Sequence, residues 1–249
     1  MAGKSTPKRL DALVLEHGLA DSIAKAQAMI LAGEVSVDGA RVDKAGTRFP
    51  QQARIEVNSR SAKFVSRGGF KLEGALDDFA VDPGARVCLD IGSSTGGFTD
   101  CLLQRGAVRV YAVDVNVDQL VWTLRQDPRV IRISRNARDL RPADLPEPLE
   151  LIVADVSFIS VSKVLPAAVA VAKPGADLLV LVKPQFELPR EDVGPGGIVS
   201  DPALHQKAIS AVSKAASKLG LELLDTRPSR LPGAEGNQEY FLHARKPLR

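Results

Sequence analysis

The chain has 249 residues, of which 45% are hydrophobic and 25% are charged. This is the composition of a globular protein, and it excludes collagen-like, disordered and coiled-coil classes. The length suits one large α/β domain, or a medium one with a small appendage. The formal net charge of +3 is unevenly spread: residues 1–71 hold twelve Lys or Arg and seven Asp or Glu, and the remainder holds twenty-one and twenty-three. A basic front segment suggests a part that faces nucleic acid, although such an excess is also common on solvated faces.

No segment of the sequence predicts a membrane helix. The longest uninterrupted apolar stretch, residues 164–172, is far shorter than the ~20 residues that a spanning helix needs. The N-terminal residues are basic but lack the apolar core of a secretory signal, so we expect a cytoplasmic protein without a membrane partner. Cys88 and Cys101 are too few for a disulfide framework or a metal site, and we expect both to be buried thiols.

The front of the chain predicts a compact unit of two helices and a hairpin. Apolar residues recur at helical spacing between residues 9 and 29, and Ser22 can cap the second helix. Strand-like alternation then flanks the turn pair Asp38-Gly39. We assign residues 1–57 to this unit and the polar, basic residues 58–67 to a linker.

The rest of the chain, residues 68–249, predicts an α/β fold with a doubly wound, seven-stranded, mostly parallel sheet. Apolar strand-like runs alternate there with helical stretches. The seven runs are residues 87–92, 108–115, 130–134, 149–158, 177–184, 221–226 and 239–245. The last two are joined by turn residues with no helical pattern, so we expect the final strand to be antiparallel. Ligands of such sheets bind at the carboxyl ends of the central strands.

The segment LDIGSSTGGFTD, residues 89–100, predicts a cofactor site. It is a strand that ends in a glycine-rich turn and opens a helix, and its glycine spacing differs from the GxGxxG of dinucleotide enzymes. Asp114 closes the next strand, where a carboxylate can accept both ribose hydroxyls of a nucleoside. The combination fits S-adenosylmethionine. The expected cofactor residues are Asp90, Gly92, Ser93, Ser94, Gly96, Gly97, Asp114, Asp139, which could reach the adenine amine, and Asp155.

Chemically active residues also gather at this edge of the predicted sheet. In the usual strand order the ends at Gly92, Asp155 and Lys183 lie side by side. Glu239 begins the antiparallel strand at the same edge, and Lys71 joins them if its helix packs there. Taken alone, each has an ordinary role: an amine that reaches water along a buried stem, a helix cap, or an exposed carboxylate.

Five segments together form a recognisable set: SRGGFKL, LDIGSSTGGFTD, VADVSFIS, LVKPQFE and GNQEYF. They resemble the signature segments of the TlyA (hemolysin A) family of rRNA 2′-O-methyltransferases, whose catalytic domain is of the FtsJ type. Residues 9–39 similarly resemble the RNA-binding module of ribosomal small-subunit protein S4. The family's Lys-Asp-Lys-Glu tetrad then falls on four residues. They are Lys71, Asp155, Lys183 and Glu239.

The resemblance further implies the substrate and the partner. It implies a cytidine 2′-hydroxyl in ribosomal RNA within a ribosomal subunit, and the short lead-in and tail look like the subtype that modifies large-subunit RNA. The expected RNA contacts are Arg9, Lys25, Arg41 and Arg67. One departure is Ile23, which stands where relatives often have an arginine after the capping serine.

We hypothesise that Lys183 is the base of this reaction. A ribose hydroxyl is a weak nucleophile, so the enzyme must align it with the methyl donor and help to remove its proton. A nearby positive Lys71 and partial burial would lower the pKa of Lys183, whereas Asp155 and Glu239 would oppose that shift.

Three alternatives remain open from the sequence. A non-catalytic RNA-binding factor for ribosome assembly would keep the module and the cofactor site but lose the tetrad, whose four positions are all filled here. A membrane-lytic hemolysin would need a spanning or long amphipathic segment. A pseudouridine synthase is suggested by Arg9-Leu10-Asp11, but this tripeptide lies at the start of the module's first helix.

Overall fold

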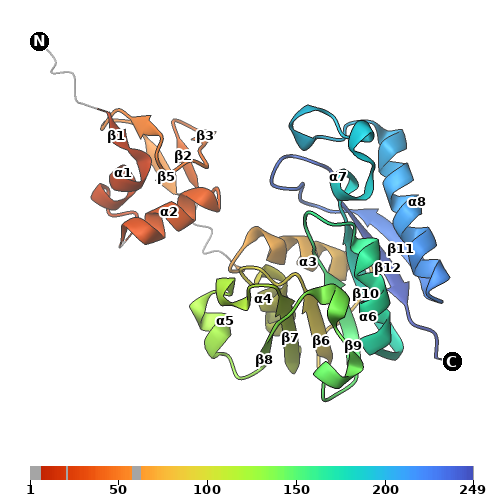
Figure 1. Cartoon of the computed structure of the whole chain (residues 1–249). Coiled ribbons are helices and arrows are strands. Elements are labelled where there is room, and N and C mark those ends of the chain that lie inside the picture. Colours follow the sequence, from red (N-terminus) through yellow and green to blue (C-terminus); the bar gives the residue numbers. More distant parts are fainter. Residues whose placement is uncertain (1–6, 21, 58–62, 249) are drawn as a thin grey trace, which may run out of the picture. The chain divides into compact units, whose positions relative to one another are not determined.

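The chain folds into two compact units, Met1–Lys63 and Phe64–Arg249, in the computed structural model (Figure 1). The structure describes residues 7–20, 22–57 and 63–248. Residues 58–62, the first half of the expected linker, lie outside the described part, and residues 64–67 belong to the second unit. Each unit is considered by itself below.

The first unit contains two helices and two small antiparallel sheets, and this confirms the expected helices and hairpin. The helices are α1 (Leu10–Glu16) and α2 (Ile23–Leu31). The strands are β1 (Lys8–Arg9), β2 (Val35–Val37), β3 (Ala40–Arg41), β4 (Arg48–Phe49) and β5 (Ile55–Val57). β2 is the central strand of one sheet, in the order β3-β2-β5, and β1 pairs with β4. Ser22 caps α2 by accepting a hydrogen bond from the Lys25 amide at 3.2 Å, as expected from its position.

The second unit is built on a seven-stranded sheet in the order β11-β12-β10-β9-β6-β7-β8. Its strands are β6 (Val87–Ile91), β7 (Arg109–Asp114), β8 (Val130–Ser134), β9 (Leu149–Ala154), β10 (Ala172–Val182), β11 (Glu222–Pro228) and β12 (Tyr240–Arg245). All seven predicted strands are therefore present. β12 runs antiparallel to both of its neighbours, as the helix-free connection before it indicates. β6, β9 and β10 are adjacent, so their carboxyl ends meet at one edge.

Helices cover both faces of this sheet. The α-helices are α3 (Arg67–Asp78), α4 (Gly97–Gln104), α5 (Trp122–Gln126), α6 (Leu165–Val171), α7 (Pro184–Glu187) and α8 (Pro202–Lys218). Short 3-10 helices are η1 (Val117–Gln119), η2 (Ala137–Asp139), η3 (Pro142–Asp144), η4 (Val161–Lys163), η5 (Arg190–Asp192) and η6 (Pro195–Gly197). α3, α4 and α5 contribute to the core on one face, and α6 and α8 to the core on the other.

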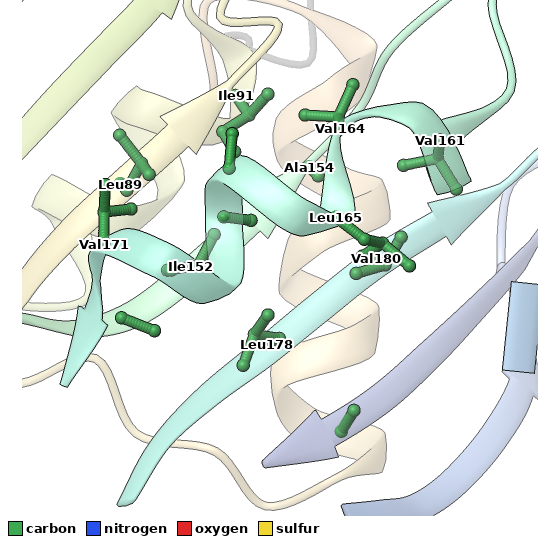
Figure 2. Close-up of a cluster of buried hydrophobic side chains, with 14 of the residues drawn as sticks. Leu89, Ile91, Ile152, Ala154, Val161, Val164, Leu165, Val171, Leu178 and Val180 are labelled. Atoms are coloured by element: carbon green, nitrogen blue, oxygen red, sulfur yellow. The ribbon is translucent and has the colours of Figure 1, made fainter. Parts of the chain in front are cut away.

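The two cores follow from the alternation of side chains along each strand. In β6, Leu89 and Ile91 point into the core shared with α6, which Figure 2 shows together with Ile152 and Leu165. The side chain of Cys88, the residue before Leu89, points to the other face of the sheet and belongs to the core with α3 and α4. A one-residue shift of register would exchange these faces, so the apolar pattern fixes the register of the strand.

The cysteines are buried free thiols, as expected. Burial raises the pKa of the Cys88 thiol to about 12, so it stays protonated at neutral pH and is a poor nucleophile or metal ligand. In the described part of the chain, no helix combines the length and apolar character needed to cross a membrane.

Candidate active site

The glycine-rich turn between β6 and α4 brings two strand ends very close together. Gly92 has a φ of +83°, and a Cβ at this position would lie 2.2 Å from the backbone oxygen of Asp155 at the end of β9. Gly96 has a φ of +101°, and a Cβ there would lie 2.2 Å from Leu124. Both positions therefore require glycine for conformation and for space. The close approach places the turn against the segment that carries Asp155.

Asp90 lies fully buried beneath this turn. One of its carboxylate oxygens accepts a hydrogen bond from the Thr99 hydroxyl at 2.6 Å, and the other, Oδ1, has no hydrogen-bond partner. Burial raises the pKa of Asp90 to about 7; the Thr99 bond opposes the shift, and the negative charge of Asp155 adds to it. The hydroxyl of Ser93 is likewise buried without a partner. Unpaired buried oxygens of this kind are costly and suit a ligand that donates hydrogen bonds or carries positive charge.

Asp114 ends β7 beside the turn. Its carboxylate accepts hydrogen bonds from the Ser94 amide at 3.0 Å and the Asn116 amide at 3.1 Å, which fix its orientation. It lines a pocket of about 450 Å³. The other lining residues include Gly92, Ser94, Arg135, Asn136, Ala137, Arg138, Asp155, Ser157 and Phe158. Asp139, expected to reach the adenine amine, is exposed and does not line this pocket. The four residues before it, 135–138, do line it.

A second pocket of about 190 Å³ adjoins the first, because Gly92, Ser94 and Asp155 line both. Its other lining residues include Ser66, Arg67, Gly68, Lys71, Ser93, Gly97 and Phe98. α3 therefore does pack over this edge of the sheet, as the placement of Lys71 requires. Arg67, expected to bind RNA, also lies here and donates a hydrogen bond to the Pro232 carbonyl at 3.3 Å.

The four residues of the expected tetrad form two lysine-carboxylate pairs. The Lys71 amine lies 2.5 Å from Oε2 of Glu239, whose side chain is only 3% exposed. The Lys183 amine lies 2.5 Å from Oδ1 of Asp155 and 2.8 Å from the Ser157 hydroxyl. The first of these two contacts is an ion pair without the alignment of a hydrogen bond, since Oδ1 has no hydrogen-bond partner. One member of each pair, Lys71 and Asp155, lines the 190 Å³ pocket.

An exposed aromatic ring stands at the rim of the larger pocket. Phe158 is 88% exposed and has a φ of +67°, which is unusual for a bulky side chain. Its ring centroid lies 5.5 Å from that of Phe186, and the Lys183 amine lies 5.9 Å from the Phe186 centroid. A strained, exposed ring beside a polar pocket offers a flat apolar surface to a ligand.

The remaining RNA-binding candidates lie in the first unit. Lys25 and Arg41 are exposed, and the Arg9 side chain is half exposed. Arg9 donates two hydrogen bonds to the buried Asp11, at 3.0 and 2.7 Å, and Gln27 donates a third at 2.8 Å. Asp11 therefore holds the Arg9 side chain in place, and the tripeptide that could indicate a pseudouridine synthase serves this internal ion pair.

Sequence reasoning missed two hydroxyl residues of the site. Thr99 binds Asp90, and Ser157 binds Lys183. Ser157 follows Asp155 by two residues in the segment VADVSFIS, and this closeness in sequence was the signal that could have placed it in the site. Glu187, which had no assigned role, accepts hydrogen bonds from the Ser160 hydroxyl at 2.6 Å and the Val161 amide at 2.7 Å. Its role is to cap η4.

Comparison with known proteins agrees with this arrangement. The FtsJ-like methyltransferase model matches residues 64–246, and the S4 domain model matches residues 8–55. The chain is 47% identical over 239 residues to the 16S/23S rRNA (cytidine-2′-O)-methyltransferase TlyA of Mycobacterium tuberculosis, across 95% of this chain and 89% of that protein. It is 41% identical over 237 residues to hemolysin A of Brachyspira hyodysenteriae, across 94% of this chain and 98% of that protein.

A solved structure from Streptococcus thermophilus, described as a candidate hemolysin, has the same fold. It superposes with a TM-score of 0.76 at 39% identity, across 97% of this chain and 89% of that one. The family match covers the whole sheet and the site described above. The chain therefore belongs to the FtsJ-like methyltransferase family, in its TlyA (hemolysin A) branch, and carries an S4 domain at its N-terminal end.

Proposed function

We propose that the protein transfers a methyl group from S-adenosylmethionine to the 2′-hydroxyl of a cytidine in ribosomal RNA. The observation that carries the proposal is the presence of two lysine-carboxylate contacts beside the glycine-rich pocket, one of them buried and the other partly buried. The name of the Mycobacterium tuberculosis relative supports the substrate, and the S4 domain supports an RNA partner. A ribosomal substrate would place the protein in the cytoplasm.

The residues of the larger pocket suit S-adenosylmethionine. Asp114 has carboxylate lone pairs available for the two ribose hydroxyls, and Asn136 and Ala137 line the part of the pocket suited to the base. The unpartnered oxygens of Asp90 and Ser93 lie beneath the turn, where a cationic amino-acid group would satisfy or neutralise them. Gly92 keeps the backbone open to close approach. When bound, this cofactor supplies an activated methyl group.

Lys183 would remove the proton of the ribose hydroxyl. A neutral amine has two N–H groups and one lone pair. The Ser157 hydroxyl accepts one N–H group of the Lys183 amine at 2.8 Å, and Oδ1 of Asp155 lies 2.5 Å from the same nitrogen. The lone pair would face the substrate hydroxyl. The proton would pass from that oxygen to Nζ as the bond from the oxygen to the methyl carbon forms and the bond from the methyl carbon to the sulfonium sulfur breaks. Asp155 stabilises the ammonium that results.

Lys71 and Glu239 would hold the substrate ribose. The Glu239 carboxylate restrains the Lys71 amine at 2.5 Å, and Lys71 lines the pocket next to Asp155. A fixed positive charge there can bind the phosphate or the hydroxyls of the reacting nucleotide and limit its motion. Arg67 in the same pocket adds a second cation for the RNA backbone.

The S4 domain would contribute shape-selective and phosphate contacts to structured RNA. We assign these contacts to Arg9, which Asp11 holds in place, and to the exposed Lys25 and Arg41. Ile23 is 39% exposed at the start of α2 and adds no charge to this surface.

The proposal is tested by supplying S-adenosylmethionine labelled in its methyl group together with ribosomal subunits that lack the modification. Large and small subunits are assayed separately, and their RNA is digested to nucleosides. We expect the label in 2′-O-methylcytidine from at least one subunit. Label confined to a methylated base, or no label in RNA from either subunit, would overturn the proposal.

A further inference from the structure

The Glu239 carboxylate lies at the point where a long connection enters the sheet, and the Ser229 amide donates a hydrogen bond to the Glu239 main-chain carbonyl at 2.8 Å. Glu239 is 2% exposed and immediately precedes β12, at the end of the connection that follows β11. Its pairing with Lys71 depends on how this connection is held, because a carboxylate displaced by about 1 Å no longer restrains the amine. On one side of Glu239, Asn237 contacts residues 194–199 in the connection between α7 and α8. On the other side, Tyr240 is linked to the same residues through His205 of α8.

Asn237, two residues before Glu239, binds that segment through both ends of its amide. Its Oδ1 accepts a hydrogen bond from the Val199 amide at 2.8 Å, and its Nδ2 donates one to the Gly197 carbonyl at 2.8 Å. The side chain is 2% exposed, so these bonds are shielded from water. The two contacts together fix the position of the segment relative to Glu239.

His205 on α8 makes the second link. Its Nε2 lies 2.7 Å from the Val199 carbonyl, and its Nδ1 lies 3.0 Å from the hydroxyl of Tyr240, the residue after Glu239. A carbonyl oxygen only accepts, so Nε2 carries a proton and donates a hydrogen bond to Val199, while Nδ1 shares a hydrogen bond with the Tyr240 hydroxyl. His205 is 8% exposed. His205 therefore bridges the same residue, Val199, to the other side of Glu239.

We propose that Asn237 and His205 are positioning residues that hold Glu239 in register with Lys71 by fastening Val199 to both of its flanks. The inference rests on the proposed function, because it gives Glu239 a part in methyl transfer. The two backbone groups of Val199 are both used, one by Asn237 and one by His205. Gly197, at a φ of +79°, provides the turn that presents its carbonyl to Asn237.

This arrangement predicts a specific kinetic pattern. Removing either side chain should loosen Glu239 and thereby lower kcat by about tenfold to a hundredfold, the range that a displacement of about 1 Å produces. The dissociation constant for S-adenosylmethionine should change less than about twofold, since neither residue lines the pocket that contains Asp114. A general loss of folding would instead lower kcat and raise this dissociation constant together.

The experiment compares His205→Ala, Asn237→Ala and Glu239→Gln with the matched control Gln206→Ala, an exposed neighbour of His205 on α8. Single-turnover methyl transfer, cofactor affinity and thermal unfolding are measured for each variant. The deciding measurement is His205→Ala in the Glu239→Gln background. If His205 acts through Glu239, this second substitution lowers the residual rate less than about twofold.

Several outcomes would overturn the inference. One is an unchanged kcat for both His205→Ala and Asn237→Ala. Another is an equal effect of His205→Ala on the rate in the wild-type and in the Glu239→Gln background. A third is a loss of kcat in these variants that Gln206→Ala matches. Full activity of Glu239→Gln itself would instead show that the assigned role of Glu239 is wrong. Methyl transfer by the wild-type protein is measured in the same series, so failure of the proposed function is distinguished from failure of this inference.

Discussion

Replacing Gly92 by alanine should damage cofactor binding more than it damages folding. Two penalties act at this position. The left-handed φ of +83° costs a side chain about 1–2 kcal/mol, and the new Cβ would lie 2.2 Å from the backbone oxygen of Asp155. Real Cβ contacts of this kind need about 1 Å more, so the ends of β6 and β9 must separate by about that distance. Both pockets are lined by these two strand ends, and we expect S-adenosylmethionine to bind at least tenfold more weakly.

Gly220→Ala is the matched control. Gly220 has a φ of +80°, and nothing lies within 4 Å of where its Cβ would be, so this substitution carries the conformational cost without the clash. It should lower the free energy of unfolding by about 1 kcal/mol and leave cofactor affinity unchanged. Titration calorimetry and thermal unfolding measure the two effects. Wild-type affinity in Gly92→Ala, or an equal loss of affinity in Gly220→Ala, would refute this reasoning.

Three further predictions concern pH and exposed groups. Burial raises the pKa of Asp90 to about 7, so binding of the cationic cofactor should release a proton from this carboxyl group. The dissociation constant of the cofactor should therefore rise as pH falls from 8 to 6. Calorimetry that gives the same pH dependence for Asp90→Asn would contradict this. Burial alone would raise the pKa of Asp177, but hydrogen bonds from His243 and two arginines outweigh it and lower the pKa. Asp177 therefore stabilises the fold fully above its pKa in the unfolded chain, which is near 4, and this stabilisation is lost as pH falls below that value. In denaturant unfolding, Asp177→Asn should lower the free energy of unfolding by about 3 kcal/mol at pH 7 and by less at pH 3. An equal loss at both pH values would contradict this prediction. Phe158→Ala should leave the thermal unfolding temperature unchanged, because the side chain is exposed. It should lower the rate of methyl transfer at limiting RNA about tenfold, because stacking of a base on a ring is worth about 1–3 kcal/mol. An unchanged rate would show that the ring does not contact RNA.

The fold could be predicted because its signals are local. Each of the seven strands is a short apolar run bounded by turn residues, and the absence of a helical pattern before residue 239 indicates the antiparallel final strand. From the strand order, the convergence of Asp155, Lys183 and Glu239 at one edge follows. The placement of Lys71 needed the further assumption that its helix packs there, which the lining of the smaller pocket bears out.

The pairings within the site could not be predicted, because they depend on side-chain rotamers and on loops. Strand order brings two lysines and two acids together but does not tell which amine meets which carboxylate. The contact of Ser157 with Lys183 depends on the backbone path after β9, which includes the strained Phe158. The links from Asn237 and His205 join segments that are 38 and 35 residues apart. No periodic pattern records such contacts.

The most direct test of the account is the single-turnover rate of Lys183→Met compared with its affinity for S-adenosylmethionine. Lys207→Met, which removes an exposed lysine paired with Asp192, is the matched control. We predict that Lys183→Met lowers the rate by about 10²–10⁴, the usual contribution of a positioned base, while the dissociation constant for the cofactor stays near that of the wild type. A rate for Lys183→Met equal to that of Lys207→Met would contradict the account.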